Sequence, residues 1–205
     1  MQLKLEGLDM TDEIHCTGFR GTARIASGPL AQVAAKVKAV IDAGEPSTIL
    51  IFDDVTSEPV ELDFRGSVDD VTKRLAGRSG GAAASPADQP ARGPGRPKLG
   101  VVAREVTLLP RHWEWLARQP GGASVALRRL VEEARRANGG KDRLREVQAS
   151  TYRFMSALAG NEAGFEEAAR ALFAGNSAGF SEATGAWPPD VRDHAMKLAA
   201  AALPD

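Results

Sequence analysis

A stretch of low sequence complexity divides the chain and limits the size of any single domain that it can form. The 22 residues from Gly77 to Lys98 contain five glycines, four prolines, five alanines and two serines, but no aromatic or β-branched residue. Side chains of these types bury too little apolar surface to offset the entropy that is lost on ordering. We therefore expect a flexible linker over residues 78–98, preceded by a folded module over residues 1–77.

Charge is distributed unevenly around this linker. The 205 residues carry 26 basic and 27 acidic side chains, a formal net charge of −1. Residues 1–77 hold 8 basic and 13 acidic side chains, residues 78–138 hold 11 and 5, and residues 139–205 hold 7 and 9, so the segment charges are −5, +6 and −2. A basic middle between acidic flanks indicates a polyanionic partner such as duplex DNA, or attraction to an acidic protein surface, including the N-terminal module itself.

The composition argues against several classes of function. Cys16 is the single cysteine, which excludes an intramolecular disulfide and multi-cysteine metal sites, and the three histidines lie far apart in the sequence. No apolar run is long enough to cross a membrane, and the mixed charges of residues 1–13 do not resemble a signal peptide. We expect a cytoplasmic protein with no membrane association, no metal site and no cofactor.

The pattern before the linker begins with a hairpin and a helix. Two short strands are predicted at residues 16–19 and 22–26, on either side of Gly21, which suits a tight turn. Apolar residues at helical spacing then predict a helix with Ser27 as its cap and Gly44 at its end.

A second hairpin and a closing helix complete the predicted module. Residues 48–52 form a β-branched apolar run, and residues 60–64 alternate apolar and acidic side chains. Ser67 and Asp70 have the spacing of a capping box, which opens the closing helix. The fold class is therefore α+β, with the element order ββαββα in this module.

Two residue pairs in the module have side chains capable of chemistry. Asp53 and Asp54 follow a predicted strand, where carboxylates can bind Mg²⁺, but a polar turn is the simpler interpretation because no third carboxylate or glycine-rich loop accompanies them. His15 and Cys16 are neighbours on a strand and point to opposite faces, so they do not form a base and nucleophile pair without a third orienting group.

The basic middle segment, residues 99–138, follows a strand–helix–helix pattern. We predict a strand at residues 104–109, a short helix at residues 111–119 and, after a Pro-Gly-Gly break, an amphipathic helix at residues 124–137 that Ser124 caps. This order resembles the ribbon-helix-helix fold, in which two chains pair their strands and insert them into the DNA major groove. The resemblance implies a homodimer.

The same resemblance implies which side chains would meet DNA. Outward strand residues would contact bases, and the amides that open the second helix would hold a phosphate. The sequence departs from this pattern at Val106, Leu108 and Leu109, which are apolar where polar residues should stand. The predicted nucleic-acid contacts are Arg92, Arg96, Lys98, Arg104, Thr107, Arg111, Ser124 and Arg128.

Two further features lie in or next to this segment, and each can be interpreted either as a DNA contact or as ordinary structure. Residues 95–98 resemble the core of an AT-hook, an extended arm that lies in the minor groove of A·T tracts, but Pro94 stands where the first arginine belongs, so a solvated linker is the alternative. Trp113 fits a core stripe with Leu116, whereas Trp115 lies on another helix face; base stacking is the alternative for both.

The C-terminal region, residues 139–205, is predicted to be helical. A first helix with a long apolar stripe is expected to end at Gly160. A ten-residue unit then occurs twice, at residues 159–168 and 174–183, with eight identical positions. The repeated residues predict two short helices with asparagine caps and phenylalanine anchors, and these are Asn161, Asn176, Phe165 and Phe180.

A last helix is expected to begin at the Trp-Pro-Pro sequence of residues 187–189. Val191, Ala195, Leu198 and Ala202 are predicted to face inward, and His194 is expected at the surface.

Several short motifs together resemble one bacterial family, which is catalogued as domain of unknown function 2239. The motifs are GRPKLG at residues 95–100, REVTLLPRHWEWL at 104–116, GGAS at 121–124, YRFMS at 152–156 and Trp187-Pro188. The likeness spans nearly the whole chain except the linker. It implies a bacterial cytoplasmic protein and supplies no activity, substrate or site residues.

Two hypotheses follow for the function. The first is a DNA-binding, regulatory protein, dimeric, whose basic middle segment contacts phosphate. The second is a non-enzymatic adaptor whose basic segment binds an acidic protein surface. An enzyme is the least favoured class, because the sequence offers no acid–base pair, nucleophile system or metal cluster.

Overall fold

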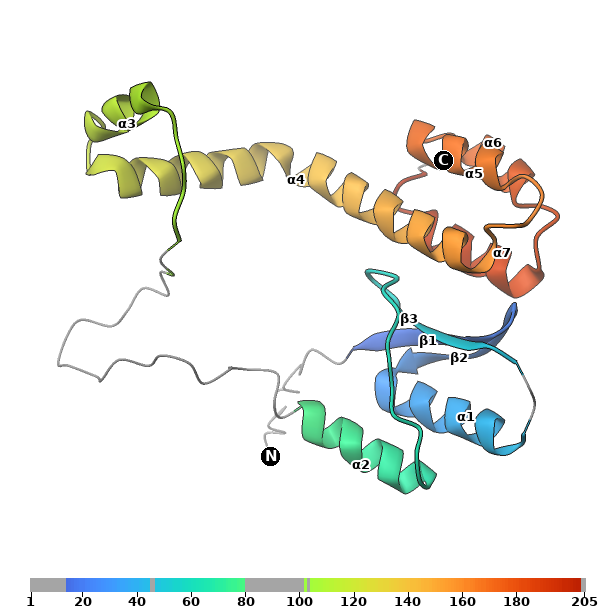
Figure 1. The fold of residues 1–205 in the computed structure, drawn as a ribbon. Coiled ribbons are helices and arrows are strands. Elements are labelled where there is room, and N and C mark those ends of the chain that lie inside the picture. The colour runs from blue at the N-terminus through green and yellow to red at the C-terminus, as the bar shows by residue number, and fades with distance from the viewer. Residues whose placement is uncertain (1–13, 45–46, 80–101, 103, 204–205) are drawn as a thin grey trace, which may run out of the picture. The chain divides into compact units, whose positions relative to one another are not determined.

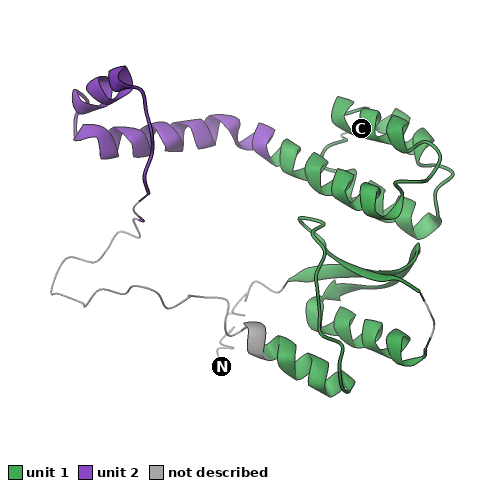
Figure 2. Ribbon diagram, viewed as in Figure 1, with its two compact units in different colours: residues 1–82, 143–205 green, residues 83–142 purple. Residues whose placement is uncertain are grey.

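The computed structural model describes residues 14–44, 47–79, 102 and 104–203. The chain divides into two compact units (Figure 2): unit 1 comprises residues 1–82 and 143–205, and unit 2 comprises residues 83–142. Strands occur near the N-terminus and the remaining elements are helices, so the α+β class is confirmed. Of the predicted linker, only residues 78 and 79 lie among the described residues, at the end of a helix.

Unit 1 contains a three-stranded antiparallel sheet in the order β2-β1-β3 (Figure 1). β1 spans His15–Arg20, β2 spans Ala23–Pro29 and β3 spans Ile49–Asp53. Gly21 has a φ of 55° in the turn between the first two strands, the left-handed conformation that glycine adopts without steric cost. The predicted hairpin is therefore confirmed.

One face of the sheet packs against α1, Leu30–Asp42. Cys16 and Ile51 cluster with Val33 and Val37 of this helix. A Cβ at Gly18 would lie only 3.1 Å from Val37 Cγ2, so the missing side chain permits this close approach of the helix. The predicted helix is confirmed, but its cap is not: β2 continues through Ser27, and Pro29 occupies the N-cap without a side-chain hydrogen bond.

The fourth strand expected at residues 60–64 is not formed. The Val60 N–H donates to the Ile51 carbonyl at 2.8 Å, and Phe52 forms a single bridge with Pro59. Beyond that point the chain leaves the sheet, because Leu62 and Phe64 pack against the apolar residues of α1 and of the following helix. The alternating pattern reflects this packing and not a paired strand.

The closing helix of the module, α2, spans Val68–Ser79. The Ser67 N–H donates to Asp70 Oδ2 at 2.9 Å, and the Asp70 N–H donates to Ser67 Oγ at 3.2 Å. These reciprocal bonds form the predicted capping box. Val71 and Leu75 bury the inner face of this helix against α1.

The other face of the sheet is covered by helices from the C-terminal part of the chain. Phe19 and Phe52 meet Phe154 of α4 (Gly122–Leu158), with ring centroids 5.4 Å apart in both pairs. These rings belong to one buried cluster that includes residues of four helices. The helices are α4 (Gly122–Leu158), α5 (Phe165–Ala174), α6 (Ser177–Ala183) and α7 (Pro189–Ala199).

The two copies of the repeated decapeptide adopt different structures at their starts. Asn176 caps α6, with its Oδ1 accepting from the Gly179 N–H at 3.0 Å, as predicted. Asn161 does not cap α5; Gly164 occupies that position with a φ of 83°. A Cβ at Gly164 would overlap the carbonyl oxygen of Ala183, so packing of α5 against the end of α6 sets this geometry.

Unit 2 contains α3, Pro110–Ala117, and the first part of α4. The predicted short helix is confirmed within two residues of its expected end. The strand expected at residues 104–109 is absent from the described sheet, and those residues have no regular structure.

α4 is a single helix of 37 residues, although the sequence predicted one helix at residues 124–137 and a separate first helix in the C-terminal region. Gly139 and Gly140 lie in its interior and have no neighbouring atoms that a Cβ would meet. Each glycine costs about 1 kcal/mol relative to alanine in a helix. Helix formation is cooperative, so the long helical segments on both sides keep the two glycines helical despite this cost.

These glycines provide a matched test of the packing. Gly164→Ala is expected to lower the free energy of unfolding by at least about 2 kcal/mol, because it combines a left-handed φ with a clash against backbone. Gly140→Ala is expected to raise stability by up to about 1 kcal/mol. Urea denaturation followed by circular dichroism measures both; a Gly164→Ala midpoint equal to that of the wild type would contradict the described packing.

Candidate functional site

The eight predicted DNA-contact residues fall into three groups in the structure. Arg92, Arg96 and Lys98 lie outside the described residues. Arg104 and Thr107 lie in the irregular segment before α3, and both are exposed. The remaining three are helical and exposed: Arg111 in α3, and Ser124 and Arg128 in α4.

Among the five of these residues that the structure describes, one pair is hydrogen-bonded. Arg128 Nε donates to the Ser124 carbonyl at 3.1 Å, within α4. Ser124 is not the predicted cap, because α4 begins two residues earlier at Gly122. Both Gly121 and Gly122 have positive φ values, the left-handed conformation that glycine adopts without steric cost.

The arginines of unit 2 differ in whether a carboxylate lies beside them. Arg118 pairs with Glu114, Arg129 with Glu133, and both Arg135 and Arg136 with Glu132, at 3.1–3.9 Å. In the part of the chain that the structure describes, no acidic side chain lies within ion-pair distance of Arg104, Arg111 or Arg128. These three cations keep their charge available to a partner.

Unit 2 also exposes large apolar side chains. Trp113, predicted for the core, is 41% exposed and Trp115 is 48% exposed. In its described part, the large apolar side chain that is buried is Leu116. The exposed set comprises Val102, Val106, Leu109, Trp113, Trp115, Val125, Leu130 and Val131.

The acidic pair Asp53 and Asp54, at the end of β3, has a structural role. Asp53 Oδ1 accepts from the backbone N–H groups of Val55 and Thr56, which makes a tight turn. Asp54 accepts from the Thr17 hydroxyl at 2.6 Å and from Lys197 Nζ at 3.2 Å. Groups of three potential metal ligands are absent from the described residues.

Cys16 is buried beneath the sheet and is not poised for nucleophilic chemistry. Burial, with the negative charges of Asp54 and Asp53, raises the pKa of its thiol to about 12. The thiolate is therefore scarcely populated near neutral pH. His15 is exposed while Cys16 is fully buried, as expected for neighbours on a strand.

His194 is buried, contrary to the expectation that it lies at the surface. It is 1% exposed, its ring centroid lies 4.6 Å from that of Phe154, and its Nε2 has no hydrogen-bond partner. The signal was present in the sequence: residue 194 follows Val191 by three and precedes Leu198 by four, so it lies on the inward face of α7. The surface prediction rested on the residue type alone and did not take this helical register into account.

The surroundings of His194 favour its neutral form. Burial lowers the pKa of the imidazole to about 4; Asp54 acts in the opposite direction, while Lys197 and Arg24 reinforce the shift. The ring therefore acts as an apolar space-filling group between the sheet and α7 near neutral pH.

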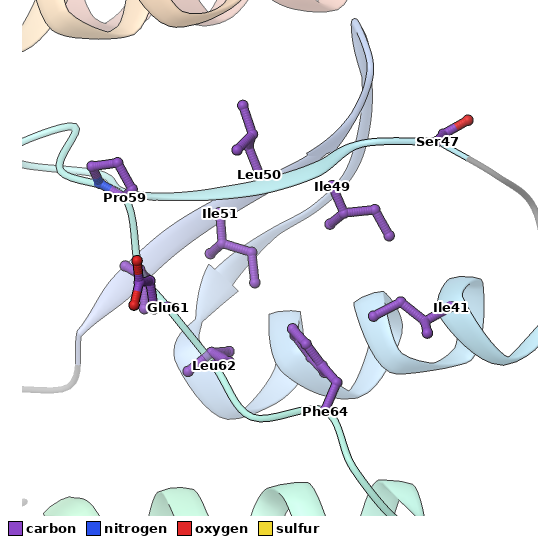
Figure 3. Close-up of a pocket in the computed structure, with 10 residues that line it drawn as sticks. Ile41, Ser47, Ile49, Leu50, Ile51, Pro59, Glu61, Leu62 and Phe64 are labelled. Carbon is purple, nitrogen blue, oxygen red and sulfur yellow. The ribbon is translucent and has the colours of Figure 1, made fainter.

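A groove of about 590 Å³ opens beside β3 in unit 1 (Figure 3). Ile49 and Ile51 point into it from the strand, and Ile41 of α1 closes one end. Leu62 and Phe64, on the segment that leaves the sheet, form its opposite wall. This groove was not predicted, because residues 60–64 were expected to form a strand in the same space.

A second hollow of about 600 Å³ lies between α5 and α6. Two of its charged residues pair with each other, since Arg170 Nη2 lies 2.7 Å from Glu167 Oε1. Glu182 also lines it and has no ion-pair partner among the described residues, so this hollow offers no unpaired cation like the arginines of unit 2.

Comparison with known proteins defines the class to which this chain belongs. The described helices include none long and apolar enough to cross a membrane. The chain belongs to a bacterial family described as "uncharacterized protein conserved in bacteria (DUF2239)", whose model matches residues 15–199. The family resemblance found in the sequence is confirmed, whereas the ribbon-helix-helix resemblance is not shown. No curated protein and no solved structure matches the chain.

The buried histidine predicts a loss of stability in mild acid. The unfolded chain takes up a proton at His194 near its ordinary pKa of 6.5, but the folded chain does so only near 4. Its contribution to stability is therefore complete above pH 6.5, falls as the pH drops through 6.5, and levels off below about 4. The expected total loss is on the order of 3 kcal/mol.

Urea denaturation at several pH values tests this expectation. His194→Leu should flatten the curve between about pH 7 and 5, whereas His112→Gln, at an exposed position, should leave it unchanged. Parallel curves for the wild type and His194→Leu would show that another group causes the acid sensitivity.

Proposed function

We propose that this bacterial protein binds duplex DNA in the cytoplasm and acts as a regulatory protein. The observation that supports this most directly is the state of Arg104, Arg111 and Arg128. All three are exposed, and none has a carboxylate partner among the described residues. Binding a phosphate at such an arginine does not require an existing ion pair to be broken first.

The charge distribution supports the same partner. The three arginines belong to the segment over residues 78–138, which carries a net charge of +6 in a chain of net charge −1. Neutralising phosphates releases counterions from the duplex, so the driving force depends on local cations and not on the total charge. The other cationic residues among the predicted contacts are Arg92, Arg96 and Lys98, which precede the described part of unit 2.

The proposed contacts are to the DNA backbone and not to the bases. Val106 and Leu109, in the same segment as Thr107, are 53% and 49% exposed. Apolar side chains form no hydrogen bonds with base edges and can only contact the thymine methyl. Affinity should therefore depend strongly on salt and weakly on sequence.

A non-enzymatic adaptor is the second candidate function. The exposed tryptophans and valines of unit 2 favour a protein partner, because aromatic side chains are enriched in protein interfaces. In that case the same arginines would meet the carboxylates of an acidic protein surface. The two candidates make different predictions for the choice of polyanion.

DNA binding is tested by fluorescence anisotropy with a labelled duplex over a range of salt concentrations. The triple variant Arg104→Gln, Arg111→Gln, Arg128→Gln should reduce the slope of log affinity against log salt by about 3, because three phosphate contacts are lost. The same loss is expected for Arg92→Gln, Arg96→Gln, Lys98→Gln.

A matched control removes the same charge elsewhere. Arg65→Gln, Arg170→Gln, Arg192→Gln removes three arginines of unit 1 that pair with carboxylates, and it should leave the slope unchanged. Affinity that is absent at low salt, or that survives both test variants, contradicts the proposal. Tighter binding to poly-glutamate than to duplex DNA at equal salt would favour the adaptor.

We also propose that the exposed apolar residues of unit 2 join two copies of the chain. Half-exposed side chains of this size contribute on the order of 80–100 Å² each, so eight of them approach the ~800 Å² that each partner buries in a standard interface.

Light scattering should give twice the chain mass of 21.7 kDa. The Leu130→Lys, Val131→Lys variant should be monomeric, and Val55→Lys, at an exposed position in unit 1, should remain dimeric. A wild-type monomer at about 100 μM would exclude the dimer.

A further inference from the structure

The outer edge of β3 carries backbone groups that the described chain leaves unpaired. In an antiparallel pair, alternate residues direct their N–H and C=O toward the neighbouring strand. The Gly21 N–H donates to the Thr48 carbonyl and the Asp54 N–H to that of His15, so even-numbered residues here bond toward β1. Odd-numbered residues therefore face outward, and the Val60 N–H meets the Ile51 carbonyl on that side.

The outward pairing ends before Ile49. Val60 is the last described residue that bonds to this edge, since the chain then turns toward α2. Among the described residues, no hydrogen bond reaches the outward N–H and C=O of Ile49. An edge with these two groups free accepts one more extended strand.

The groove lies beside this open edge and suits apolar side chains. Ile49 and Ile51 point into it while Leu50 points to the opposite side of the sheet (Figure 3). Ile41, at 38% exposed, and Phe64 offer further apolar surface. A strand added at the edge would direct every second side chain into this space, because strand side chains alternate between faces.

Acidic side chains at the groove indicate which charge the added strand carries. Glu61 lines the groove near Pro59, and Glu58 lies just before it in the sequence. Both carboxylates are exposed, and neither has a cationic partner in the described part of unit 1. The nearby acids Asp42 and Asp63 differ, since they pair with Lys38 and with Arg65. The open carboxylates favour a lysine or arginine on the bound segment.

We propose that unit 1 binds a short basic peptide of a partner protein as an additional strand on β3. The peptide's backbone pairs with Ile49, alternate aliphatic side chains enter the groove, and a basic residue meets Glu61. This recognition mode combines main-chain hydrogen bonds, which supply affinity, with pockets for alternate side chains, which supply selectivity. It is independent of the DNA contacts proposed for unit 2.

The test uses the full chain and defined hexapeptides. The basic probe is acetyl-Lys-Ile-Thr-Ile-Thr-Lys-amide, with lysine at both ends so that either strand direction is served. The acidic probe replaces both lysines with glutamate, and a third probe replaces both threonines with proline, which removes backbone donors. Calorimetry measures affinity, and hydrogen exchange followed by NMR reports on the Ile49 amide.

We expect the basic probe to bind with a submillimolar Kd and to slow exchange of the Ile49 N–H, and the proline probe to do neither. Ile41→Lys should weaken binding at least about tenfold, because it places a charge in the apolar wall. Glu61→Lys should weaken the basic probe and strengthen the acidic one. Val55→Lys adds the same single positive charge as Ile41→Lys, at a position 80% exposed; it is the matched control for that variant and should bind like the wild type.

Three results would overturn the proposal. The first is no binding of the basic probe at about 1 mM, where a Kd below that value would be detected. The second is equal binding by wild type, Ile41→Lys and Glu61→Lys. The third is protection of the Ile49 amide without peptide that disappears on dilution to the monomer, which would assign the edge to a second copy of the chain.

Discussion

The contact between the second face of the small sheet and the C-terminal helices is the interaction on which unit 1 depends. A three-stranded sheet with α1 on one face alone would leave Phe19 and Phe52 in water. Instead both rings meet Phe154, and His194 completes the cluster with its ring centroid 5.5 Å from that of Phe19. Polar contacts frame this aromatic centre: Asp54 with Lys197, Arg24 with Asp190, and Ser57 with Ser150.

The same contact explains why several residues do not follow their usual preferences. β1 is buried along most of its length, although an antiparallel strand with one wet face would alternate. Ser57 adopts a φ of 53°, uncommon for a serine, and its hydroxyl lies 2.9 Å from that of Ser150 on α4. His194 remains neutral because water is excluded from its surroundings.

Turns and helix caps that depend on residues close in sequence could be predicted. Features that depend on contacts between residues far apart in sequence could not. The turn at Gly21, the Ser67–Asp70 box and the Asn176 cap depend on neighbours within a few residues, so the sequence displays them directly. A strand was wrongly predicted at residues 60–64, because alternating apolar and polar side chains indicate that one face is buried but not which element covers it. The sequence predicted one helix ending at residue 137 and another in the region that follows, but cooperative helix formation joins them through Gly139 and Gly140. For the candidate sites, the sequence shows where the arginines lie, but only the structure separates those that pair with a carboxylate from those that do not. The groove could not be predicted, because it depends on where the chain leaves the sheet.

The circular arrangement of unit 1 has a consequence for how the protein is made. Arg24 bonds to Asp190 across 166 residues, and Lys197 reaches Asp54 across 143. During synthesis the N-terminal hairpin leaves the ribosome long before the helices that cover Phe19 and Phe52 exist. Non-local contacts of this kind form slowly, and an apolar sheet face that waits for its cover is prone to aggregation. The acidic charge of the first 77 residues, −5 in total, would keep such nascent chains apart until the last helix arrives.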